Sequence, residues 1–173
     1  MSELPQKVPF GYEPQEEDRK GTIVYYDSFE HVSDRELDLA ALTVKERSFA
    51  RLVLYPLHEQ TVKRMSKEPV SALYKREDKL YEWKRERESV NVVVERLEAK
   101  RKKYTPIDSA LRHIAETYPG PLFLLLSGET ANAFASYSSF EEWIVKLRLL
   151  VIVEPRILHP KLLQYRHRWD SLV

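Results

Sequence analysis

The chain of 173 residues contains no cysteine. Disulfide bonds, thiolate zinc sites, iron–sulfur clusters and cysteine nucleophiles are therefore excluded. Only four glycines are present, and they form neither a Walker loop nor the Gly-x-Gly-x-x-Gly turn that binds dinucleotides. The Gly-x-Ser-x-Gly turn of serine hydrolases is missing as well.

An excess of one charge is also missing, since the formal net charge is only +1 although 32% of the residues are charged. No overall field therefore favours nucleic acid or an anionic membrane as a partner. The longest apolar runs, Leu122–Leu126 and Leu149–Val153, are far shorter than the ~20 residues that cross a bilayer. The first twenty residues lack the basic and apolar regions of a signal peptide. We expect a soluble, cytoplasmic protein without membrane contact.

No metal-ligand spacing is present either. The five histidines are scattered and lack the i, i+4 pairing of a helical zinc site: His31, His58, His113, His159 and His167. We therefore expect no metal site, and we assign no certain cofactor.

The length fits one domain. Residues 1–20 hold three prolines and the acidic run Glu16-Glu17-Asp18, with few aliphatic side chains. We predict a flexible N-terminal arm over residues 1–20 and a folded domain over residues 21–173. Phe10 and Tyr12 are the side chains that would anchor such an arm, so the arm is one candidate contact for a protein partner.

Five runs of β-branched, aromatic or aliphatic residues are predicted as strands: Thr22–Tyr26, Phe49–Tyr55, Val90–Val94, Leu122–Leu126 and Leu149–Val153. Helices are predicted between them, after Ser33, over Ser71–Glu88, over Arg96–Lys103, after Thr105 and after Ser138 or Ser139, with a last one over Lys161–Arg168. Residues 56–69 are predicted to be a loop with one helical turn at most. This alternation indicates an α/β fold, a single doubly wound and mostly parallel sheet.

Two helix starts carry specific signals. Ser33 and Glu36 have the spacing of a capping box. Thr105 precedes Pro106 and the early acid Asp108, which predicts a capping hydroxyl followed by proline at the first helical position.

Three segments occur in the order and on the elements of a known family. Residues 26–33 resemble its Asp-Pro-x-His-x-Gly-His pattern, residues 104–111 its Tyr-Thr-x-Asp-Thr-Leu segment, and residues 122–130 its apolar strand followed by Gly-x-Asp. From about Thr22 to Arg156 the chain thus resembles the nicotinate-nucleotide adenylyltransferase branch of the HIGH-motif nucleotidyltransferases. The resemblance implies a Rossmann-like nucleotidyltransferase fold and, in an active member, adenylyl transfer from ATP with Mg²⁺ in NAD biosynthesis.

The chain departs from the family where the phosphates are bound. Glu30, Val32 and Ser33 stand where the family has its two histidines and the glycine between them, and His31 is one place out of register. The family's closing Ser-Ser-Thr-x-Ile-Arg segment has no counterpart after Arg156. We therefore expect a degenerate member, a pseudoenzyme that binds a nucleotide or a protein partner. A working nucleotidyltransferase is the alternative.

If catalysis survives, Asp27, His31 and Lys63 are the candidate catalytic residues. Asp27 ends the first strand, where open α/β sheets bind ligands, although it has the alternative role of capping the turn. Lys63 shares one segment with His58 and Arg64, and these three side chains fit an anion or form a solvated basic turn.

By resemblance, the remaining candidate nucleotide-binding residues are Ser33, Thr105, Asp108, Gly128 and Thr130. For Ser33 a helix cap is the competing role. For Gly128 the competing role is a tight turn after a buried strand.

Two further surfaces are candidates for partners. The basic run Lys100–Lys103 would suit a nucleic acid, but the glutamates interleaved before it, such as Glu95 and Glu98, are typical of a solvated, ion-paired helix. Trp169 with Tyr165 has the composition of a protein-docking patch, or of a helix folded back on the domain.

Overall fold

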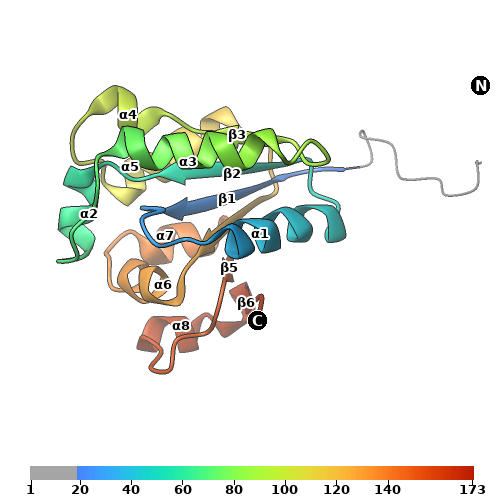
Figure 1. Ribbon diagram of the computed structural model, residues 1–173. Helices are drawn as coiled ribbons and strands as arrows, with labels where there is room; N and C mark the ends of the chain where they lie inside the picture. The colour runs from blue at the N-terminus through green and yellow to red at the C-terminus, as the bar shows by residue number, and fades with distance from the viewer. Residues whose placement is uncertain (1–18) are drawn as a thin grey trace, which may run out of the picture.

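The computed structural model describes residues 19–173 (Figure 1). The predicted arm therefore lies outside the described residues, except for Arg19 and Lys20. The chain forms one six-stranded sheet in which every pairing is parallel. Its strands are β1 (Thr22–Asp27), β2 (Arg51–Pro56), β3 (Val92–Val94), β4 (Leu122–Leu126), β5 (Arg148–Val151) and β6 (Trp169–Ser171).

The strands lie in the order β3-β2-β1-β4-β5-β6, which is the order of doubly wound, Rossmann-like sheets. The connecting helices are α1 (Asp34–Glu46), α2 (Glu59–Met65), α3 (Leu73–Arg85), α4 (Leu97–Arg101), α5 (Ile107–Thr117), α6 (Gly128–Ala135), α7 (Phe140–Ile144) and α8 (Pro160–Gln164). The predicted fold class is confirmed.

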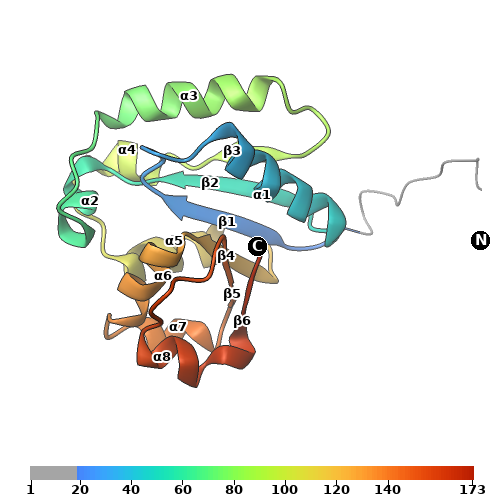
Figure 2. The same cartoon turned by 60° about the horizontal axis from the view of Figure 1, so that its bottom comes forward.

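Alternation along the central strand explains why both faces of the sheet are covered. Ile23 and Tyr25 pack into one apolar cluster with α1 and α3, whereas Val24 and Tyr26 pack into a second with α5, α6 and α7. All four side chains are at most 2% exposed. Figure 2 shows α1 and α3 separated from α5–α8 by the sheet. Each buried aliphatic side chain of this kind contributes ~1.5–3 kcal/mol relative to exposure.

One predicted helix cap is confirmed and the other is wrong. Ser33 begins α1 with a complete capping box, in which its hydroxyl accepts from the Glu36 amide and Glu36 accepts from the Ser33 amide. At α5, Pro106 is the N-cap and no side chain caps the helix. Thr105 is fully buried instead, and its hydroxyl accepts a hydrogen bond from Arg101 at 2.9 Å.

The C-terminal segment corrects a second prediction. Trp169 is only 2% exposed, and its indole N–H donates to the carbonyl of Leu162 at 2.8 Å. It begins β6, a short edge strand that pairs with β5, so it is a core residue and not a docking patch. The predicted helix over 161–168 is divided into α8 and a 3₁₀ turn at Arg166–Arg168.

The charged segment before the basic run also differs from its prediction. Glu98 is 1% exposed and Glu95 is 9% exposed, so neither lies on a solvated, ion-paired face. Glu95 follows an edge strand and Glu98 belongs to α4, a separate short helix. Within residues 19–173, no helix is long and apolar enough to cross a membrane.

Candidate functional site

Two neighbouring clefts open at the carboxyl ends of the strands. The chain leaves β1 and β4 toward opposite ends of the sheet order, and such a switch point is where open α/β sheets bind ligands. A cleft of about 250 Å³ lies there, between the segments that follow β1 and β4; we call it the switch-point cleft. A second cleft of about 690 Å³ lies beside it, with Tyr104 and Tyr137 on its wall; we call it the hydroxyl cleft. Met65 lines both.

The loop between β1 and α1 is held by its own side chains. Asp27 accepts from the amide of Phe29 at 2.8 Å, and the Ser28 hydroxyl accepts from the amide of Glu30 at 3.2 Å. The capping box then takes the amides of Ser33 and Glu36. Backbone amides at such a turn are the groups that cradle phosphates in nucleotide-binding proteins. Four of them are thus already bonded within the chain.

Phe29 fixes the shape of this loop. Its φ is +63°, a left-handed conformation that costs a non-glycine residue of order 1 kcal/mol. Two contacts hold it there, namely the amide bond to Asp27 and the edge-on packing of its buried ring on Tyr25 at 5.0 Å. Burial raises the pKa of Asp27, while the Phe29 amide and the Ser28 hydroxyl act in the opposite direction. Asp27 therefore takes the turn-capping role that competed with catalysis.

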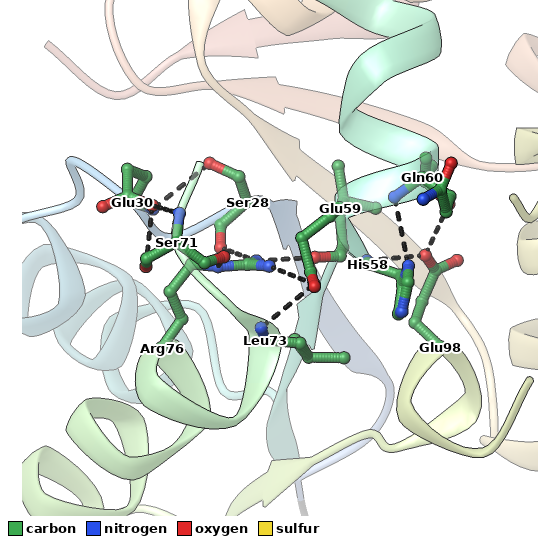
Figure 3. Close-up of polar contacts among 11 residues, drawn as sticks. Ser28, Glu30, His58, Glu59, Gln60, Ser71, Leu73, Arg76 and Glu98 are labelled. Atoms are coloured by element: carbon green, nitrogen blue, oxygen red, sulfur yellow. Dashed lines mark hydrogen bonds and ion pairs between the residues drawn. The ribbon is translucent and has the colours of Figure 1, made fainter. Parts of the chain in front are cut away.

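Glu30 connects this loop to the start of α3 (Figure 3). Its carboxylate accepts from both the amide and the hydroxyl of Ser71, the hydroxyl at 2.9 Å. The Ser71 amide is the main cause of a lowered pKa for Glu30, and the nearby Arg76 adds to it. In this position Glu30 keeps a negative charge at the wall of the switch-point cleft.

Arg76 lies buried beneath that contact, with 2% of its side chain exposed. Its guanidinium donates to the carbonyls of Ser28, Leu57 and Ser71, and it pairs with Glu59 at 3.1 Å. Figure 3 shows these groups converging from the loops after β1 and β2 and from α3. Its N–H groups are hydrogen-bonded to backbone carbonyls and one carboxylate. This arginine therefore connects the walls of the cleft and does not face a ligand.

A second buried polar cluster lies at the start of α2 and is centred on the carboxylate of Glu98. Glu98 accepts from the Tyr55 hydroxyl at 2.7 Å, from the Thr61 hydroxyl at 2.7 Å and from the His58 amide at 2.8 Å. The imidazole of His58 caps α2 by accepting from the Gln60 amide at 3.0 Å (Figure 3). The segment predicted to be a loop is thus a helix from Glu59, and His58 is used at its N-terminus, away from Lys63 in its last turn.

The charges around the switch-point cleft are almost all negative. Among residues 19–173, five carboxylate residues line it, together with His31 and no lysine or arginine: Asp27, Glu30, Glu36, Glu68 and Glu129. A like charge opposite a polyphosphate costs binding energy, and four amides of the β1–α1 segment are already bonded within the chain. The cleft is therefore unsuited to a triphosphate.

The hydroxyl cleft has a different chemistry. Three tyrosines and five serine or threonine side chains line it: Tyr26, Tyr104, Tyr137, Thr61, Thr105, Ser136, Ser138 and Ser139. Arg64 also lines it, and the Arg64 guanidinium stacks on the Tyr104 ring at 4.2 Å from the centroid. The acids on its wall are Asp108 and Glu142.

Asp108 is held in place on that wall. It accepts from the indole N–H of Trp143 at 2.7 Å and from Arg112 at 2.7 Å. These two hydrogen bonds, the indole first, lower its pKa. The neighbouring Thr105 is buried and donates its amide to Thr61 at 3.0 Å. Both residues therefore form a stable part of the cleft.

Gly128 and Thr130 begin α6 after β4. A Cβ on Gly128 would lie 2.7 Å from the carbonyl oxygen of Val153, so glycine is required by the chain segment after β5. The Thr130 amide donates to the Ser127 hydroxyl at 3.1 Å, which caps the helix. No helix was predicted between Leu126 and Ser138, so α6 is an addition to the predicted elements, and the glycine packs on backbone of the domain itself.

The predicted site residues are divided between several places. Asp27, His31 and Thr130 line the switch-point cleft, and Arg64, Thr105 and Asp108 line the hydroxyl cleft. Ser33, His58, Lys63 and Gly128 line neither. Sequence reasoning missed Glu129 and Tyr137, although Glu129 lies three residues after a buried strand and that position was a usable signal.

Fold and site together define a Rossmann-like α/β domain with a hydroxyl-rich cleft and an acid-lined switch point. No protein-family model matches the chain, and none of the curated proteins matches it significantly.

Proposed function

We propose that this protein is a degenerate nucleotidyltransferase-like protein that binds a mononucleotide-type ligand in the hydroxyl cleft and does not transfer an adenylyl group. The observation that carries the proposal is the state of the β1–α1 loop, whose amides at Phe29, Glu30, Ser33 and Glu36 are bonded to the chain's own side chains. Adenylyl transfer requires donors that stabilise the charge of the departing pyrophosphate. Here these four amides already have acceptors, and carboxylates line the cleft beside them.

The hydroxyl cleft supports the binding half of the proposal. Its volume of about 690 Å³ is typical of small-molecule sites. The partly exposed rings of Tyr104 and Tyr137 offer faces for a planar base, and Arg64 suits one phosphate or carboxylate. The hydroxyls of Ser138 and Ser139 suit a ribose. The resemblance to nicotinate-nucleotide adenylyltransferases makes nicotinate mononucleotide the first ligand to test. The cytoplasmic location expected from the sequence belongs to this proposal as well.

Thermal unfolding with nicotinate mononucleotide, its adenylylated product and ATP tests the proposal. A ligand present at ~100 times its dissociation constant stabilises the folded state by ~2.7 kcal/mol. We expect such a shift with nicotinate mononucleotide and none with ATP. The shift should be lost in Arg64→Ala and kept in Lys63→Ala, which removes a neighbouring exposed cation outside both clefts.

Two outcomes would contradict the proposal. Turnover of ATP and nicotinate mononucleotide that falls by orders of magnitude in His31→Ala would establish the alternative, a working nucleotidyltransferase. The absence of any shift with all three ligands would remove the mononucleotide and leave a protein partner. Binding of nucleic acid through Lys100–Lys103, the third reading, would appear as an affinity that falls steeply with salt.

A further inference from the structure

A basic groove of about 920 Å³ opens at the amino edge of the sheet, away from both clefts. It is bounded by Arg19, which lies three residues before β1, by the residues before β2 and β3, and by the C-terminal ends of α1 and α3. Figure 2 shows that these two helix ends lie at the same end of the molecule as the starts of β1 and β2. We call it the amino-edge groove.

Positive charge dominates this groove. Its charged lining residues are Arg19, Lys84, Arg85, Arg87 and Glu88. Arg87 is already engaged, since it pairs with Asp38 at 2.7 Å and lies over the Trp83 ring. The ion pairs formed within residues 19–173 include none of Arg19, Lys84 and Arg85. Three cations thus face one groove with a single acid, Glu88, beside them.

Apolar groups form the floor between these cations. Tyr81 and Val90 are half-buried and pack on the cluster that α1 and α3 share with the sheet. The fully buried Phe49 lies beneath, with its ring edge-on to Phe123 at 4.8 Å. A partner for this groove therefore needs carboxylates for the rim and an aromatic or aliphatic side chain for the floor.

We propose that the amino-edge groove binds residues 10–18 of the same chain. This segment, Phe-Gly-Tyr-Glu-Pro-Gln-Glu-Glu-Asp, supplies four carboxylates and two aromatic rings and has no cation. Its composition is complementary to the rim and the floor. The inference is independent of the proposed function, because the groove lies at the opposite edge of the sheet from the ligand clefts.

Chain continuity brings the segment to the groove. The Lys20 amide donates to the Ser48 carbonyl at 3.1 Å, which fixes the chain beside the start of β2. Arg19 lines the groove, and Asp18 precedes it directly, about 3.8 Å away between Cα atoms. Nine extended residues reach ~30 Å, whereas the part of α3 that lines the groove, from Tyr81 to Arg85, is roughly 8 Å long at helical rise. The segment is therefore long enough to pass along this wall of the groove.

Paramagnetic relaxation in the full chain tests this contact, and the absence of cysteine makes the labelling specific. A spin label on Gln6→Cys should broaden the amide resonances of residues 81–92 in low salt. The double variant Lys84→Glu/Arg85→Glu should lose that broadening, and Glu16→Lys/Glu17→Lys added to it should restore it. Lys100→Glu/Lys102→Glu is the matched control, since it changes the net charge equally at exposed positions outside the groove. Its broadening should equal that of the unaltered chain.

Each alternative result overturns the proposal. Broadening that is unchanged in Lys84→Glu/Arg85→Glu would show that the groove cations do not hold the segment. Broadening of an isotope-labelled chain by a spin label on another copy would assign the contact to a second molecule. Melting curves of every variant establish that the domain is folded, and 1 M salt, with a screening length of ~3 Å, should weaken a genuine charge contact.

Discussion

Glu30 and Ser71 are 41 residues apart in sequence, and one carboxylate oxygen of Glu30 accepts both the amide and the hydroxyl hydrogen bonds of Ser71. The contact joins the loop after β1 to a residue two positions before α3, beside the buried Arg76. Glu30 thus places a negative charge on the wall of the switch-point cleft, and Ser71 gives that charge a structural partner.

Glu30→Gln should destabilise the protein by about 1 kcal/mol at pH 7, because the charged acceptor of two hydrogen bonds is lost. The Ser71 amide lowers the pKa of Glu30 in the folded state. Its contribution is therefore present above the unfolded value, ~4.3, and is lost as the pH falls through the folded pKa. The free energies of unfolding of the two proteins should converge in acid, as measured by urea titration. Glu82→Gln, an exposed change on α3, is the control, and equal effects of the two changes at pH 7 would contradict the prediction.

Glu98→Ala should cost more than 3 kcal/mol. The side chain is 1% exposed and accepts hydrogen bonds from Tyr55, Thr61 and the His58 amide, so its removal leaves three donors without their acceptor. Tyr55→Phe removes only one of these hydrogen bonds and should cost about 1 kcal/mol. Denaturant unfolding of both variants provides the measurement. If the two changes lower the free energy of unfolding equally, the hydrogen bonds of Glu98 to Thr61 and His58 do not hold α2 in place.

The sequence predicted what depends on local pattern. Leu122–Leu126 is a strand at the predicted bounds because a continuous apolar run of that length suits a strand covered on both faces. The capping box at Ser33 was predictable because both partners lie within four residues. β6 was not predicted, because Trp169 is the one apolar side chain among its three residues. The strand is defined by its pairing with β5.

The candidate site was less predictable for the same reason. Asp27 could be placed at the carboxyl edge from the end of one strand. Tyr26, Tyr104 and Tyr137 line one cleft only because β1, the α4–α5 loop and the α6–α7 loop meet there. Glu98 appeared solvated because it precedes four basic residues, whereas three donors from distant segments account for its burial. Such contacts leave no periodic trace in the sequence.

Gly128→Ala should destabilise the protein by ~1–3 kcal/mol without any ligand present. The added Cβ would meet the Val153 carbonyl oxygen at 2.7 Å and the Pro155 ring at 3.1 Å, so the segment after β5 must shift. Glu129→Ala, at the next and exposed position of α6, should change stability by less than about 1 kcal/mol. Calorimetry of the two variants makes the comparison. A stability equal to that of the unaltered protein would mean that the segment after β5 accommodates the added methyl group without cost, which would contradict the prediction.

Two adjacent leucines test whether the C-terminal segment belongs to the core. Leu162 is 0% exposed and its carbonyl receives the Trp169 indole, whereas Leu163 is 59% exposed. Leu162→Ala should therefore cost ~2–5 kcal/mol, the range for large-to-small changes in a packed core. Leu163→Ala makes the same chemical change on the same helix and should stay within ~0.5 kcal/mol of the unaltered protein. Denaturant titration followed by tryptophan fluorescence measures both. If Leu162→Ala unfolds at the same midpoint as Leu163→Ala, then α8 and β6 do not fold cooperatively with the sheet, and Trp169 would again be a candidate for binding a partner.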